Sequence, residues 1–355
     1  MNKRLNNFEA LRILAMFMVI TLHYLSKGGI LTSATEEFTG ASYVVWLVEA
    51  FAVVAVNVYV LITGYFLCES NMKPKRLLEI VCQVLWYTIL IPVVLLILGV
   101  VTPHNFDMYD LLRFVFPVHM KHYWFVTAYV LLMLLVPFLN AGIQHMDRKQ
   151  LTFSTALLVV YNTLPKSVLP VKFTDDEAGN HVMWLVCLYL IAAYIRKYGI
   201  PFFNSLKKSL LCYVGGALAI FASLLVMRMI YFKLDAFEEG LNFGYHYNHV
   251  LCLFASVALF YVFKYWEFKD SAVSRLIGKT APYTFGVYLI HEHLFVRDLW
   301  PEWLHVEPTE NIIMLLFGLI WKVSLVLIVG LFLDWLRGLV FKEIGKLIGR
   351  YRRTN

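Results

Sequence analysis

Two polar residues, Arg12 and His23, interrupt an apolar stretch near the N-terminus, "FEALRILAMFMVITLHYLSK" at residues 8–27. A neutral imidazole can take a proton from a hydroxyl, so His23 is a candidate general base. A guanidinium can bind a phosphate through two parallel hydrogen bonds, so Arg12 is a candidate for holding an anionic substrate group. Within an apolar segment such residues are costly and normally face protein or water.

The spacing of Arg12 and His23 places them on one face of a helix. Eleven residues bring His23 back to about 20° from Arg12, at roughly 16 Å along the helix axis. Such a pair could hold an elongated ligand, with its anionic part at Arg12 and its reacting end at His23. Alternatively, Arg12 reaches to the membrane surface and His23 lies at headgroup level. The spacing alone leaves both interpretations open.

The next apolar segment carries further polar side chains. Glu49 and Asn57 lie within a helix-length apolar run, and either Glu49 or the later Glu292 is a candidate to orient the His23 imidazole. Directly afterwards, "ESNMKPKRLL" supplies Lys73 and Arg76. Basic residues at a helix entrance suit phosphate groups, although cytoplasmic loops of membrane proteins are basic in any case.

Aromatic and histidine residues open a later segment, "HMKHYWFVTAYVLLMLLVP", which contains His122, Tyr123 and Trp124. These residues could stack against a sugar or form an aromatic belt at the membrane surface. The segment "APYTFGVYLIHEHLF" ends in a His-Glu-His triplet at 291–293. On one helix the two histidines of this triplet face different sides, and no third ligand has a suitable spacing. We therefore expect no metal site.

The elements that must position these residues are helices in a membrane. Of the 355 residues, 60% are hydrophobic and 15% are charged, whereas a soluble domain carries about 25% charged residues. A spanning helix needs roughly 20 apolar residues. The sequence predicts an all-α polytopic membrane protein with about ten transmembrane helices, near residues 9–27, 43–68, 78–101, 122–143, 151–165, 181–198, 208–232, 246–265, 281–298 and 311–337.

The basic residues predict the orientation of these helices. With a cytoplasmic N-terminus, 21 Lys and Arg residues fall in inside segments and 7 in outside segments. Because cytoplasmic loops carry the excess of Lys and Arg, we expect both termini in the cytoplasm and His23 toward the outer surface. The net charge of +7 then follows from topology and attraction to anionic lipids, and gives no reason to expect nucleic-acid binding.

The chain is predicted to form a single membrane domain over residues 1–355. Its transmembrane bundle covers about 9–337. The tail, about 338–355, places apolar residues on one helical face and basic residues opposite them. This pattern predicts an interfacial amphipathic helix on the cytoplasmic membrane surface.

In their order along the whole chain, these segments resemble the integral-membrane acyltransferase-3 family. The resemblance rests on the Arg, ten residues, His pattern of "RILAMFMVITLH" and on "VNVYVLITGYFL", "YWFVTAYVLLMLLVPFLN", "LYLIAAYIRKYG" and "APYTFGVYLIHEH". It implies an enzyme that transfers acyl groups from acyl-coenzyme A to cell-envelope glycans. Some members add an extracellular hydrolase-like domain; this chain looks like the stand-alone O-acyltransferase type.

The resemblance also implies roles for individual residues. His23 would be catalytic, either as a general base or through an acyl-His intermediate. Arg12 would serve donor use or the integrity of the site, and Lys73 and Arg76 match the basic motif near the cytoplasmic entrance, where coenzyme A would bind. The other candidates are His122, Tyr123 and Trp124 for acceptor binding and Glu49, Asn57, His291 and Glu292 for support of the site.

We expect acetyl-coenzyme A as donor substrate and no permanently bound cofactor. The acceptor would be a hydroxyl of an extracytoplasmic or lipid-linked polysaccharide, and the chain a multi-pass plasma-membrane protein in contact with lipids. A homo-oligomer is left open. Two alternatives remain: a transporter or flippase for a glycan or lipid precursor, against which stands the lack of an internal repeat, and an acyltransferase with a non-glycan acceptor.

Overall fold

The computed structural model describes residues 6–70, 72–169, 171 and 177–354. Within these residues the regular secondary structure is helical throughout, which confirms the all-α prediction. Lys3, Arg4 and Lys172, which contribute to the predicted charge pattern, lie outside the described residues. The helices are α1 (Asn6–Lys27), α2 (Gly40–Ala52), α3 (Ala55–Leu67), α4 (Pro74–Ile97), α5 (Met108–Val115), α6 (Trp124–His145), α7 (Arg148–Val168), α8 (Val182–Lys197), α9 (Leu206–Leu234), α10 (Val250–Tyr265), α11 (Ala272–Thr280), α12 (Thr284–His291), α13 (Leu299–Trp303) and α14 (Ile312–Thr354).

Seven helical segments of the described chain are long and apolar enough to cross a membrane. The helices α7, α8 and α12 correspond to the predicted runs near 151–165, 181–198 and 281–298, but they are not among the seven. The helices α8 and α12 are short, with 16 and 8 residues, and α7 carries several polar side chains. The total of about ten spans and the side of each terminus therefore stay predictions. The seven segments are Asn6–Lys27, Gly40–Leu67, Pro74–Ile97, Trp124–His145, Leu206–Leu234, Glu238–Tyr265 and Ile312–Leu347.

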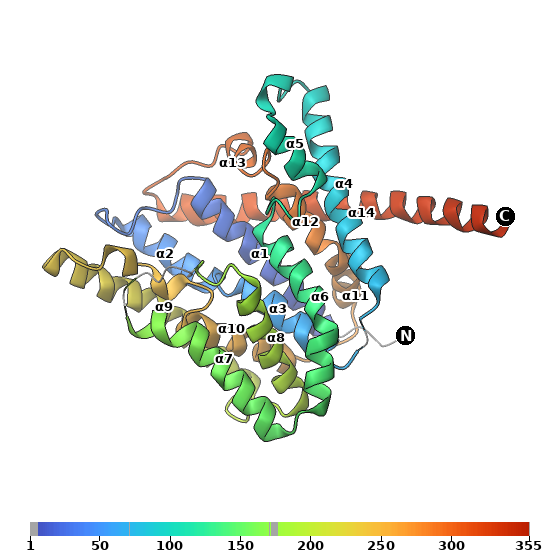
Figure 1. The fold of residues 1–355 in the computed structure, drawn as a ribbon. Helices are drawn as coiled ribbons and strands as arrows, with labels where there is room; N and C mark the ends of the chain where they lie inside the picture. Colours follow the sequence, from blue (N-terminus) through green and yellow to red (C-terminus); the bar gives the residue numbers. More distant parts are fainter. Residues whose placement is uncertain (1–5, 71, 170, 172–176, 355) are drawn as a thin grey trace.

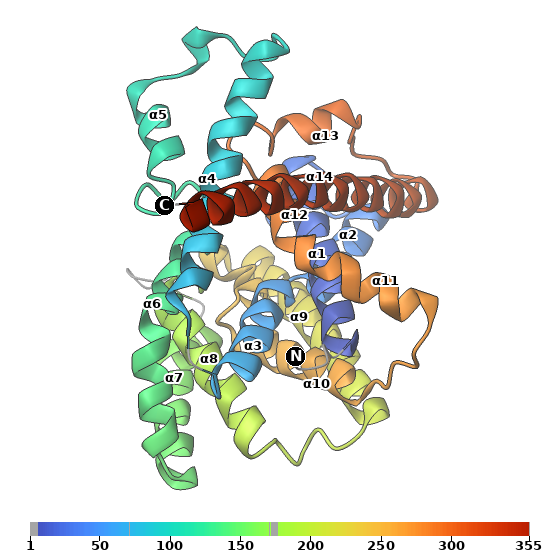
Figure 2. The ribbon, with the colours of Figure 1, turned by 90° about the vertical axis from the view of Figure 1, so that its right-hand side faces the viewer.

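The helix that carries Arg12 and His23 is enclosed by protein. In α1, 67% of the residues in its apolar window are buried, against 22% in α14. It packs against α2, α3, α10, α11, α12 and α14, and Figure 2 shows it surrounded by these elements. A simple lipid anchor would instead expose most of its surface, so α1 belongs to the core of the bundle.

The helix α12 is fixed against α14 and α4 by close packing and a buried polar network. A Cβ atom at Gly286 would lie 2.1 Å from Cγ of Asp334, so only glycine fits there. The fully buried Asp334 carboxylate accepts hydrogen bonds from Gln83 at 3.0 Å and Tyr87 at 2.7 Å. It also pairs with Arg337 at 2.6 Å. Because a buried carboxylate needs such partners, the network joins the three helices firmly.

Segments that the charge pattern places on the outer side meet at one end of the bundle. This end includes α13 and the C-terminal end of α1 (Figure 1). The contacts among these segments include Lys27 with Asp298 at 3.2 Å, Lys121 with Glu177 at 3.5 Å, and Arg228 with the carbonyl of Glu36 at 2.8 Å.

Segments placed on the inner side meet at the opposite end of the bundle, where α1 begins (Figure 1). Alternating membrane crossings require this separation of the two sets of segments. The contacts include the Asn7 side chain with the carbonyl of Phe263 at 2.8 Å, Arg196 with Glu69 at 2.7 Å, and Lys197 with the carbonyl of Ile143 at 2.7 Å.

The C-terminal region differs from its prediction. A separate tail helix over 338–355 is wrong, because α14 runs without a break from Ile312 to Thr354. Its 43 residues span about 65 Å, and Figure 1 shows its last turns extending beyond the other helices. Strong helix formers surround the three glycines of this stretch, Gly338, Gly345 and Gly349, and carry the helix through them. The apolar residues Leu339, Ile344 and Leu347 are exposed, and their contact with lipid stays a prediction.

Candidate functional site

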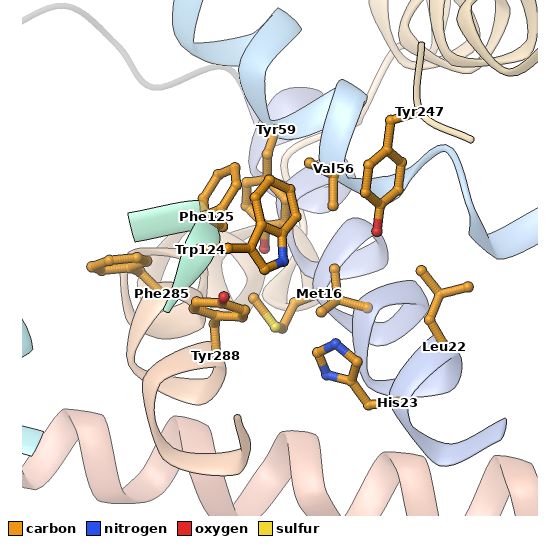
Figure 3. Close-up of a pocket in the computed structure, with 11 residues that line it drawn as sticks. Met16, Leu22, His23, Val56, Tyr59, Trp124, Phe125, Tyr247, Phe285 and Tyr288 are labelled. Carbon is orange, nitrogen blue, oxygen red and sulfur yellow. The ribbon is translucent and has the colours of Figure 1, made fainter. Parts of the chain in front are cut away.

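His23 lies in the wall of a cavity within the helix bundle. Side chains of α1, α3, α6 and α12, with Tyr247 from the segment before α10, line the cavity. Figure 3 shows the imidazole at one end of this space, with aromatic rings on the other walls. These rings belong to Tyr59, Trp124, Phe125, Tyr247, Phe285 and Tyr288.

A second histidine fixes the protonation pattern of His23. Nδ1 of His23 lies 2.9 Å from Nε2 of His291, and Nδ1 of His291 lies 2.6 Å from the carbonyl oxygen of Val287. A carbonyl only accepts hydrogen bonds, so His291 donates from Nδ1 and, when neutral, accepts at Nε2. His23 therefore donates from Nδ1, and its Nε2 carries the lone pair. Among the described residues Nε2 has no hydrogen-bond partner, so the basic atom is available to a ligand.

Glu292 adds negative charge beside the same ring. Its Oε2 lies 3.3 Å from Nδ1 of His23, without the alignment of a hydrogen bond. Its Oε1 lies 3.8 Å from Arg297. This carboxylate can stabilise the imidazolium that forms when His23 takes up a proton. Glu292, one of the two acids proposed to orient His23, is thus in contact with it.

The end of α12 brings His291 and Glu292 to the same partner. The interpretation of residues 291–293 as one continuous helix is wrong, since α12 ends at His291 and the Glu292 amide makes the last helical bond to Tyr288 at 3.1 Å. Beyond that point the chain turns, which lets two consecutive side chains face His23. His293 packs instead against the ring of His122, with ring centres 4.8 Å apart.

Arg12 has a partner within its own helix. Its guanidinium contacts both carboxylate oxygens of Glu9, at 3.0 and 3.1 Å. The Arg12 side chain is 29% exposed and that of Glu9 only 7%. The backbone carbonyl of Arg12 accepts a hydrogen bond at 2.8 Å from the hydroxyl of Tyr59, a residue that lines the cavity. Arg12 is therefore a neutralised charge on the enclosed helix, linked to the cavity through Tyr59.

Lys73 and Arg76 are exposed and lie apart from the cavity. Lys73 precedes Pro74, the first residue of α4. The chain just before them is anchored by Asn140 of α6, whose side-chain amide donates to the carbonyls of Leu67 and Ser70, each at 2.9 Å. These two cations thus project from a fixed inner end of the bundle.

The three proposed acceptor-binding residues are separated by the structure. Trp124 lines the cavity. Tyr123 is buried, and its hydroxyl donates to the carbonyl of Leu289 at 2.8 Å, which ties α6 to α12. His122 is also buried, beneath Phe114 and beside His293. Only Trp124 is therefore in a position to touch a ligand in the cavity.

The two supporting candidates in the second apolar run lie behind the cavity. Asn57 is fully buried and joins three elements: its amide donates to the carbonyl of Tyr247 at 2.8 Å and to Ser256 at 3.1 Å, and accepts from Trp184 at 2.9 Å. Asn57 thereby fixes the backbone of Tyr247. Glu49 has a buried carboxylate oxygen without a hydrogen-bond partner among the described residues, and it lies near Tyr247 rather than His23.

Sequence reasoning missed most of the cavity wall. Tyr59, Tyr247 and Tyr288 line it, yet each sits among other aromatic residues in a chain with 21 Tyr and 27 Phe. Tyr288 alone had a usable signal, because it stands three residues before His291 and so shares its helical face. The described residues hold no group of three or more His, Cys, Asp and Glu side chains arranged for a metal ion.

Comparison with protein families adds to this geometry. The model of the acyltransferase-3 family, described as an acyltransferase domain, matches residues 5–336. The match includes α1, α12 and every other element of the cavity. Comparisons with curated proteins and with solved structures gave no match. The match covers most of the chain, and the chain therefore belongs to the acyltransferase-3 family and is a membrane acyltransferase.

Proposed function

We propose that this acyltransferase moves an acetyl group from acetyl-coenzyme A to a hydroxyl of an extracytoplasmic or lipid-linked polysaccharide, with His23 as general base. The observation that carries the proposal is the orientation of His23. Its Nδ1 is held by His291, and its Nε2 is left for a ligand in the cavity. This is the arrangement that a base needs if it is to remove a proton from a hydroxyl.

The reaction conserves its atoms and charges. Nε2 of His23 takes the proton of the acceptor hydroxyl while the acceptor oxygen attacks the thioester carbon. The carbonyl oxygen becomes negative as the new C–O bond forms. The C–S bond then breaks, and the leaving thiolate takes the proton back from Nε2. Glu292, 3.3 Å from Nδ1, stabilises the imidazolium between these two steps.

The donor would reach the cavity from the inner end of the bundle. Lys73 and Arg76 are exposed there, and lysine and arginine bind phosphate groups well. Arg12 lies near the start of α1, at roughly 16 Å from His23 along the helix, a distance on the scale of an extended pantetheine arm. Its charge is balanced by Glu9 at 3.0 Å, so we propose that Arg12 lines the path of the donor.

The acceptor would enter from the outer end, where His23 lies. Trp124 and Tyr247 present aromatic rings to the cavity, stacked on each other with centres 5.8 Å apart. Aromatic faces bind the apolar faces of sugars. In this proposal the protein works in the plasma membrane, acetyl-coenzyme A is a substrate, and no resident cofactor takes part.

The test is His23→Ala in purified protein supplied with labelled acetyl-coenzyme A and an envelope polysaccharide. We expect acceptor-dependent release of coenzyme A and labelling of the polysaccharide by the unsubstituted chain, and loss of both in the variant. His145→Ala is the matched control, because that exposed ring bonds to the carbonyl of Ala141 at 2.8 Å at the far end of α6, away from the cavity. Transfer by a folded His23→Ala protein would overturn the proposal.

A further inference from the structure

The negative oxygen formed during acyl transfer needs a hydrogen-bond donor, and the Tyr288 hydroxyl in the cavity can supply one. Tyr288 lines the cavity and is only 7% exposed. Its hydroxyl is buried without a hydrogen-bond partner among the described residues. Because buried polar atoms are nearly always bonded, an unpaired hydroxyl in a ligand cavity calls for a partner that the protein itself does not supply.

Other buried tyrosines around the cavity are committed to the protein. Tyr59 donates to the carbonyl of Arg12 at 2.8 Å, Tyr123 to that of Leu289 at 2.8 Å, and Tyr245 to that of Trp46 at 2.9 Å. These hydroxyls hold helices together. The Tyr288 hydroxyl makes no such bond to a described residue, although Tyr288 is buried, as Tyr123 and Tyr245 are.

The ring of Tyr288 is held in place by its neighbours. Its centre lies 5.7 Å from that of Tyr123 and 5.9 Å from that of Phe125. It precedes His291 by three residues on α12, so the two side chains share one face of that helix. Figure 3 shows the Tyr288 ring and the His23 imidazole on neighbouring walls of the same space. One short helix, α12, therefore positions the Tyr288 hydroxyl directly and the His23 imidazole through His291.

The N-terminus of α6 ends beside this hydroxyl. Tyr123, the residue before α6, makes no side-chain capping bond. The amides of Trp124, Phe125 and Val126 consequently have no acceptor within their own helix. The Phe125 amide is directed toward the Tyr288 oxygen. The uncapped start of a helix attracts negative charge. The Tyr288 hydroxyl and the N-terminus of α6 therefore both favour a negative oxygen at this place in the cavity.

We infer that Tyr288, assisted by the start of α6, is a catalytic residue that donates a hydrogen bond to the negative oxygen of the tetrahedral intermediate. The inference rests on the proposed acyl transfer. As the acceptor oxygen bonds to the thioester carbon and His23 takes its proton, the carbonyl π electrons move to the oxygen, and the Tyr288 hydroxyl donates to it. When the C–S bond breaks, the carbonyl re-forms and the hydroxyl is released unchanged.

The experiment is Tyr288→Phe, which removes one oxygen and keeps the ring. Loss of a single donor of this kind lowers kcat by about 10² to 10³-fold. We expect this loss with little change in KM for acetyl-coenzyme A, because the hydrogen bond forms only after attack. The hydroxyl donates to no described residue, so its removal should change the unfolding temperature little.

Tyr213→Phe is the matched control. The Tyr213 hydroxyl donates to the carbonyl of Phe51 at 2.8 Å and does not line the cavity. This variant should lower the unfolding temperature and leave kcat unchanged, the reverse of Tyr288→Phe.

The outcomes separate the inference from the proposed function. Full kcat in Tyr288→Phe, with active unsubstituted protein, would overturn the role of Tyr288 alone. A fall in unfolding temperature that accounts for the lost activity would assign Tyr288 a structural role and overturn it too. An unsubstituted protein that transfers no acetyl group would overturn the proposed function, and this inference with it.

Discussion

The imidazole of His23 is held between groups of different character. His291 occupies Nδ1 at 2.9 Å and passes its own hydrogen bond to the backbone of Val287. Glu292 stands 3.3 Å away as a negative charge. The first contact selects which nitrogen is basic, and the second lowers the free energy of the protonated ring. The two adjacent residues therefore divide the positioning of one base between them.

Glu292→Gln tests the second of these roles. The amide keeps the shape of the side chain and removes its charge, so the protonated His23 loses its counter-ion. A pair of opposite charges about 4 Å apart is worth roughly 1–4 kcal/mol, and each 1.4 kcal/mol is about ten-fold in rate. We expect kcat to fall by about ten- to a hundred-fold while KM for acetyl-coenzyme A stays unchanged, measured as coenzyme A release at steady state.

Glu69→Gln serves as the control for Glu292→Gln. Glu69 pairs with Arg196 at 2.7 Å at the inner end of the bundle, where both side chains are partly exposed. Exposed pairs contribute little, so this variant should keep its kcat. Full activity in Glu292→Gln would show that its charge does not assist His23.

At the residue scale the sequence predicted a polar helix face but not the partners on it. The position of His23 on a cavity follows from the spacing and burial of α1. The Arg12–Glu9 pair, at 3.0 Å, has the ordinary three-residue spacing of helix pairs and was available from the sequence. His291, 268 residues from His23, was not, because a contact over that distance depends on how the helices pack.

Among the elements, α12 depends most on its neighbours. It has eight residues, too few for a stable isolated helix. Its conformation is held by α14, through the close approach at Gly286, and by Tyr123, the residue before α6, which donates to the carbonyl of Leu289. Because α12 carries both Tyr288 and His291, packing on its far side determines the geometry of the site.

Gly286→Ala should therefore damage stability and activity together. The added methyl group would lie 2.1 Å from Cγ of Asp334, which Tyr87 and Arg337 hold in place. Overpacking of this kind costs roughly 1–3 kcal/mol. We expect a lower unfolding temperature in detergent and a reduced kcat.

Gly215→Ala is the comparison for this variant. Gly215 lies within α9, and a Cβ there meets nothing within 4 Å. Alanine in a helix interior is more favourable than glycine by roughly 0.5–1 kcal/mol, so this variant should be as stable as the parent or more so. If Gly286→Ala and Gly215→Ala have the same unfolding temperature, the contact at Gly286 does not hold α12 in place.

The long apolar elements could be predicted and the short ones could not. Apolar runs of about membrane-spanning length gave α1, α4, α6, α8, α9 and α10 to within a few residues. The helices α5 and α13 have eight and five residues, and no apolar period distinguishes them. The end of α12 at His291 has no Gly or Pro signal. The turn there is set by contacts with distant helices, which the sequence does not display.

For the whole molecule, the separation of the predicted outer and inner segments is the main structural support for the topology. If α1 and the nine other predicted helices cross in alternation, Glu37 lies outside and Lys269 inside. Both side chains are exposed. In intact cells a membrane-impermeant maleimide should label Glu37→Cys and leave Lys269→Cys unlabelled until the membrane is opened.

The unsubstituted chain provides the baseline for this labelling. Its cysteines are Cys68, Cys82, Cys187, Cys212 and Cys252, all within or beside helices, and three of them are buried. Labelling of Lys269→Cys in intact cells would reverse the predicted orientation. Labelling of both sites would contradict the alternation of crossings.

The hydrogen bond from His291 to the carbonyl of Val287 also has a consequence for membrane energetics. A carbonyl oxygen accepts hydrogen bonds but takes up no proton. Protons therefore cannot pass from His23 through His291 to the carbonyl of Val287 and beyond. A proton taken by Nε2 must leave from Nε2, and in the proposed reaction it leaves with the departing thiolate. Acyl transfer by this route is electrically silent, and neither a transmembrane pH gradient nor a voltage should change its rate in sealed vesicles.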